Sequence, residues 1–61
     1  MNEAIRKQIL AVKETGEVNL FDRYGVQALA NEMNFYDLVV FIEEEPKAYQ
    51  HFILTGEVLE D

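Results

Sequence analysis

The chain lacks the residues on which several kinds of site depend. Its 61 residues include no cysteine and no serine, which excludes disulfides, thiolate metal sites and nucleophilic catalysis by a cysteine or serine paired with histidine. Histidine occurs once, as His51, and a lone histidine cannot form a histidine-rich metal site. We therefore expect no catalytic residue, no metal ion and no cofactor, and we do not expect an enzyme.

Carboxylates remain as candidates for chemistry, because the chain has 12 acidic residues. The densest group is the run Glu43-Glu44-Glu45, which directly follows an apolar segment. General acid–base catalysis needs a pair of carboxyl groups in a pocket that separates their pKa values. Calcium-binding loops need Asp, Asn and Gly at a spacing that does not surround this run. A solvated acidic patch, or one that binds a partner, fits the run better.

Basic residues are few, and they are unevenly placed. Residues 1–31 carry four basic and four acidic side chains, whereas residues 32–61 carry one lysine against eight acidic side chains. The whole net charge of −7 therefore lies in the second half of the chain. That half repels phosphate backbones, so we expect no direct binding to nucleic acid. It attracts a basic protein surface.

No long hydrophobic run occurs either. The longest continuous one, Leu38–Ile42, has five residues, whereas a helix needs about 20 to span a bilayer. The N-terminus, Met1–Ala4, lacks the basic and then apolar pattern of a signal peptide. These absences predict a cytoplasmic protein that does not enter a membrane.

Helical periodicity dominates what is present. Ile5, Ile9 and Val12 recur at the spacing of one helix face. Asn2 can cap the start of that helix, and Gly16 can end it in the left-handed conformation. The predicted helices are Glu3–Glu14, which Asn2 precedes, Arg23–Met33, which Asp22 precedes and Asn34 ends, Tyr36–Glu45, and a fourth that begins at Pro46 and stops at Gly56.

Residues 38–42 allow two interpretations. The segment is β-branched and aromatic, as in a buried strand, but a lone strand needs a partner and the chain offers none of comparable quality. We favour a helix, which would be apolar nearly all round and would need cover on most sides. The expected fold is therefore all-α, a compact bundle of three to four short helices completed by a twofold dimer. Residues 1–56 form its single domain, and residues 57–61 a flexible acidic tail.

The second and third predicted helices are joined tightly, as in a helix-turn-helix. The third carries Asp37 and the glutamate run but no basic residue, which argues against DNA reading by this helix. An acidic helix can instead imitate the phosphates that a DNA-binding protein expects. Nearby aromatic side chains can anchor a partner at the edge of an interface. The candidate partner-binding residues are Tyr36, Asp37, Phe41, Glu43, Glu44, Glu45 and Tyr49.

Several short segments carry a family resemblance. They are Ile9–Val12, Thr15–Gly16, Asn19–Asp22, Val26–Ala30, Phe35–Glu44 and Phe52–Gly56. With these segments the chain resembles a family of short proteins encoded by phages and prophages of Gram-positive bacteria, filed as a domain of unknown function. The resemblance implies no site residue, but it implies a context, because small phage accessory proteins often bind and disable a host factor.

Two hypotheses follow for the function. The first is an acidic phage accessory protein in the host cytoplasm that binds and modulates or inhibits a host protein with a basic surface, such as a defence or DNA-binding protein. The alternative is a structural or assembly protein whose main partner is itself or another phage protein. In the alternative the apolar run matters most, and the charge keeps the protein soluble.

Overall fold

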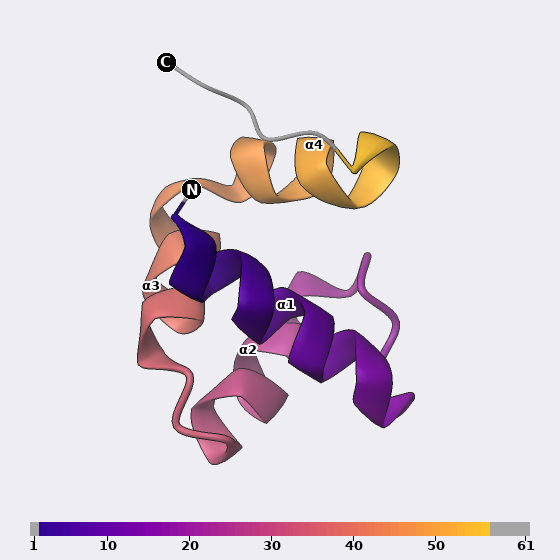
Figure 1. Ribbon diagram of the computed structural model, residues 1–61, viewed down its shortest axis with the longest axis vertical. Coiled ribbons are helices and arrows are strands. Elements are labelled where there is room, and N and C mark those ends of the chain that lie inside the picture. The colour runs from indigo at the N-terminus through magenta and orange to yellow at the C-terminus, as the bar shows by residue number, and fades with distance from the viewer. Residues whose placement is uncertain (1, 57–61) are drawn as a thin grey trace.

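Four short α-helices make up most of residues 2–56, which are the residues that the computed structural model describes (Figure 1). Each helix ends at or next to its predicted residue, and no strand occurs within this range, so the all-α prediction is confirmed. No helix in residues 2–56 has the length and apolar character needed to cross a membrane. The helices are α1 (Glu3–Thr15), α2 (Arg23–Glu32), α3 (Tyr36–Glu44) and α4 (Pro46–Thr55).

The helix ends follow from local hydrogen bonds and backbone geometry. Asn2 Oδ1 accepts from the Ile5 N–H at 2.9 Å, and Asp22 Oδ1 accepts from the Gly25 N–H at 3.2 Å. These bonds satisfy amides that have no partner inside the helix. Gly16 ends α1 with a φ of 66°, a conformation that costs glycine nothing. The predicted caps Asn2, Gly16 and Asp22 are thus confirmed, whereas α2 is capped at its C-terminus by Met33, one residue before the predicted Asn34.

The connections around α3 are tight. Asn34 has a φ of 64° in the turn after α2, where the Phe35 N–H reaches back to the Ala30 carbonyl at 2.8 Å. Asparagine tolerates this left-handed conformation better than most residues. Only Glu45 separates α3 from α4, which begins with Pro46 at the position where a missing amide costs least. The two short connections turn α2 and α4 back onto α3.

Helix α3 packs against all three other helices, α1, α2 and α4. Leu38 and Ile42 on its inner face are buried, with exposures of 0% and 1%. Val40 points outward and is 51% exposed. The apolar run at 38–42 is therefore a helix whose cover comes from three helices of the same chain, and by itself it does not require a second subunit.

Two hydrogen bonds from other helices to the backbone of α3 hold it in place. Its own N-cap residue, Phe35, has no side chain that can cap a helix, and Gln8 of α1 supplies the acceptor instead, at 3.1 Å from the Leu38 N–H. Gln27 of α2 donates to the Val39 carbonyl at 3.1 Å. Both bonds join residues that are far apart in sequence, so they fix the position of α3 against α1 and α2.

All four helices contribute to one hydrophobic core. Partly buried side chains, including Leu20 from the loop before α2, pack around it. Among the described residues, no buried side-chain nitrogen or oxygen lacks a hydrogen-bond partner. The acidic tail that the sequence predicts at 57–61 lies outside these residues. The buried core residues are Ile5, Ile9, Val12, Val26, Ala30, Leu38, Ile42, Tyr49 and Phe52.

The orientation of α3 can be tested with two substitutions on the same helix. Leu38→Ala should lower the free energy of unfolding by about 2–5 kcal/mol, because it leaves a cavity in a fully buried site. Val40→Ala should change it by about 0.5 kcal/mol or less, because Val40 is half exposed. Urea denaturation followed by circular dichroism measures both, and equal losses would contradict this orientation.

Candidate functional site

The first turn of α1 runs beside α3 (Figure 1). Side chains of both segments line a groove, which we call the α1–α3 groove. It has a volume of about 330 Å³. Its lining combines three apolar side chains with three exposed carboxylates, a mixture that suits a partner with both apolar and basic groups. The lining residues are Asn2, Ile5, Asp37, Val40, Phe41, Glu44 and Glu45.

Helical spacing explains how α3 forms one wall of this groove. Asp37, Val40, Phe41 and Glu44 stand at positions i, i+3, i+4 and i+7, which share one face of a helix. Burial of Leu38 on the adjacent face turns this stripe outward. The stripe thus has a carboxylate at each end and two apolar side chains between them, with the ends about 10 Å apart along the axis.

The carboxylates of the α1–α3 groove have no cationic partner within residues 2–56. The ion pair found there joins Arg6 to Glu3, at 3.1 Å on the surface of α1. Asp37, Glu44 and Glu45 therefore face solvent as a group of like charges. Such a group produces a negative potential that attracts a cation and raises its local concentration.

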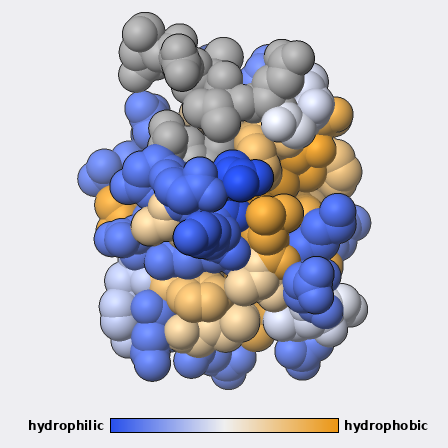
Figure 2. Space-filling model, viewed as in Figure 1, coloured by the Kyte–Doolittle hydropathy of each residue, from blue (hydrophilic) through white to orange (hydrophobic). Residues whose placement is uncertain are grey.

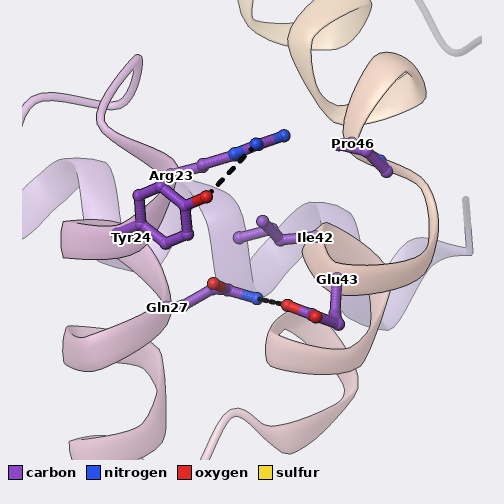
Figure 3. A pocket seen from close by; sticks show the side chains of 6 residues that line it. All are labelled: Arg23, Tyr24, Gln27, Ile42, Glu43 and Pro46. Carbon is purple, nitrogen blue, oxygen red and sulfur yellow. Dashed lines mark hydrogen bonds between the residues drawn. The ribbon is translucent and has the colours of Figure 1, made fainter.

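The structure divides the predicted glutamate run between two faces. Glu44 and Glu45 line the α1–α3 groove, but Glu43 faces α2, where Gln27 Nε2 donates to its Oε2 at 3.2 Å (Figure 3). Successive residues of a helix point about 100° apart, since a turn takes 3.6 residues. Glu43 therefore lies apart from Glu44 and Glu45, and its predicted part in partner binding stays a prediction.

Glu43 lines a second, smaller pocket of about 190 Å³ between α2, α3 and the start of α4 (Figure 3). Arg23 lies over the Tyr24 ring, 5.2 Å from its centroid, and donates to the Tyr24 hydroxyl at 3.3 Å. Gln27 and Glu43 pair on the other side of the pocket. Because these polar groups bond to one another, we assign this pocket no ligand.

The two predicted tyrosine anchors have different environments. Tyr36 is 56% exposed and donates to Asn34 Oδ1 at 2.8 Å, but it does not line the α1–α3 groove. Tyr49 is only 1% exposed, and its hydroxyl donates to the Leu20 carbonyl at 2.7 Å. The prediction that Tyr49 anchors a partner is therefore wrong, because this side chain joins α4 to the loop before α2 inside the core.

Sequence reasoning missed the contribution of α1 to the α1–α3 groove. Asn2 was predicted only as a helix cap and Ile5 only as a core residue, yet both line the groove beside Phe41. No local signal connects these positions to α3, because the contact arises when α1 and α3 pack together. Four predicted site residues do meet in the groove: Asp37, Phe41, Glu44 and Glu45.

A third depression, the α1–α4 groove, has the opposite character. Its volume is about 180 Å³, and Lys13 is its one charged lining residue. Figure 2 shows apolar surface on the side of the molecule where α1 passes α4. The α1–α4 groove is lined by Ile9, Leu10, Lys13, Leu20, Phe52, Ile53 and Gly56.

Within residues 2–56, no group of three or more His, Asp or Glu side chains could hold a metal ion.

Comparison with known families places the chain in one of them. The DUF5049 family, described as a domain of unknown function, matches residues 1–57, and the chain belongs to it. Searches of curated proteins and of solved structures gave no match. The resemblance to a family of unknown function is thus confirmed over nearly the whole chain.

The burial of Tyr49 predicts a specific dependence of stability on pH. Burial disfavours the phenolate and raises the pKa of Tyr49 from 10.0 to about 12. The unfolded chain therefore loses this proton first, so the stability that Tyr49 contributes is complete below pH 10 and falls as the pH rises to about 12.

Tyr49→Phe isolates this effect. The variant should be less stable than the wild type by about 1 kcal/mol near neutral pH, because the Leu20 carbonyl loses its donor. The difference between the two free energies of unfolding should shrink between pH 10 and about 12. Chemical denaturation at several pH values measures the difference, and a constant value across this window would disprove the assignment.

Proposed function

We propose that this member of the DUF5049 family is a non-catalytic protein-binding domain that uses the α1–α3 groove to bind a partner with a basic surface. One observation carries the proposal. The apolar side chains Ile5, Val40 and Phe41 line the same groove as the exposed carboxylates Asp37, Glu44 and Glu45.

The two kinds of side chain supply different parts of recognition. Covering Val40 and Phe41 gains about 25 cal/mol for each Å² of apolar surface removed from water. The carboxylates speed the encounter with a basic partner and fix its orientation more than they add affinity. Long lysine and arginine side chains suit such a groove, because their stems cover apolar surface while their charged ends reach the rim.

The exposure of the groove supports binding over catalysis. Acid–base catalysis needs carboxyl groups whose surroundings separate their pKa values and exclude water. Asp37, Glu44 and Glu45 are all exposed to solvent. The same three charges repel phosphates, which argues against nucleic acid as the partner.

A DNA-binding protein is one partner that fits the charge of α3. The helix presents carboxylates where a helix-turn-helix protein presents basic side chains, so it can occupy a surface that normally binds phosphates. In the phage setting that the resemblance implies, the protein would act in the host cytoplasm by modulating or inhibiting such a host protein.

Charge reversal in the groove tests the proposal. The tagged double variant Glu44→Lys/Glu45→Lys should lose the basic partner that the wild type captures from a host lysate, because it removes attraction and adds repulsion. The variant Glu14→Lys/Glu32→Lys is the matched control, since it changes the net charge by the same amount at exposed positions outside the groove. If both variants capture the same proteins as the wild type, the groove is not the binding site.

Assembly with itself or with another phage protein is the second candidate function. The observation that favours it is the α1–α4 groove, which is apolar and carries Lys13 but no carboxylate. A twofold contact through the α1–α3 grooves alone would bring together like carboxylates from both copies, which is unfavourable. Self-association therefore requires the face that carries Lys13.

A further inference from the structure

We propose that the α1–α3 groove receives helix α1 of a second copy of this chain. The inference rests on the proposed function, because it identifies a basic partner for the same groove. It combines the acidic stripe of α3 with the basic face of α1, which forms the edge of the α1–α4 groove.

Helix α1 carries the charge complement of α3. Arg6, Leu10 and Lys13 stand at positions i, i+4 and i+7 and share one face. All three side chains are exposed, Leu10 by 39%. The face thus has Arg6 and Lys13 at its two ends with Leu10 between them, and Glu3, which pairs with Arg6, lies one turn before it.

The spacing of the two helix faces matches. Arg6 and Lys13 are seven positions apart, as are Asp37 and Glu44, so each pair spans about 10 Å along its axis. Two helices that pack side by side at about 8–10 Å place such faces in contact. In the proposed contact Leu10 covers Val40 and Phe41, with Arg6 against Asp37 at one end and Lys13 against Glu44 at the other.

The basic side chains are available for this contact. Lys13 forms no ion pair within residues 2–56, and Arg6 pairs only with exposed Glu3, a contact that water screens and a new partner can replace. Asp37 and Glu44 likewise have no cationic partner in the described part of the chain. A contact between copies therefore breaks no buried pair.

The position of α1 lets the contact close on itself. Ile5 lines the groove, and the next residue, Arg6, begins the basic face. Groove and basic face therefore both involve α1 of one subunit, on faces about 100° apart. A twofold arrangement can place α1 of each copy in the groove of the other. Both grooves are then filled, and assembly stops at a dimer. The net charge of −7 opposes this dimer at long range, but salt at about 0.15 M screens remote charges more than pairs in contact.

A charge exchange tests the pairing by sedimentation equilibrium. The wild type should form a dimer, and Lys13→Glu and Glu44→Lys should each weaken it by about tenfold or more. The double variant Lys13→Glu/Glu44→Lys should recover the dimer, because the pair is restored with reversed sign and the net charge equals that of the wild type. Lys47→Glu on α4 changes the net charge by the same amount as Lys13→Glu at an exposed position that lines neither groove, so it is the control and should remain dimeric.

Two results would overturn this inference: a wild type that stays monomeric at its highest soluble concentration, or a double variant as weak as the single ones. Circular dichroism checks the fold of each variant, and the exchange Arg6→Glu/Asp37→Lys replaces the first one if a variant unfolds. A monomeric protein that still loses a captured basic partner on Glu44→Lys/Glu45→Lys would leave the proposed function intact. A dimer that captures no other protein would retain the inference and reject a host partner.

Discussion

The structure depends on the burial of one face of α3 against the other three helices. Leu38 and Ile42 make this contact, and Gln8 of α1 completes it by accepting from the first turn of α3. Once that face is fixed, helix geometry determines the direction of every other side chain on α3. The stripe from Asp37 to Glu44 must then face α1 and solvent, and the side chain of Glu43 must face α2.

A domain of about 60 residues buries a smaller share of its surface than a larger domain, so its hydrophobic core contributes less to its stability. Hydrogen bonds between segments that are far apart in the sequence add to the stability that this small core provides. Tyr49 bonds the Leu20 carbonyl and Gln27 the Val39 carbonyl, so each joins a helix to backbone elsewhere. No buried side-chain polar atom in residues 2–56 is left without a partner, which lets such a small core hold one arrangement.

Charge and apolar surface are distributed so that recognition requires both. The carboxylates of the α1–α3 groove surround apolar side chains on α1 and α3, whereas α1 presents basic side chains around Leu10 on its outer face. The net charge of −7, taken alone, would suggest a surface that is acidic on every side. The fold instead creates an acidic face on α3 and a basic face on α1, so one subunit carries both halves of a complementary surface.

The sequence alone determined the helices and their ends, because a cap, a glycine stop or an apolar stripe acts within a few residues. It also determined that the acidic excess lies in the second half, and it placed Asp37, Phe41, Glu44 and Glu45 among the candidate residues. Only the tertiary structure decided that Glu43 turns toward α2, that Tyr49 enters the core and that Ile5 completes the groove. These outcomes depend on which helix packs against which, and that contact forms between residues far apart in the chain.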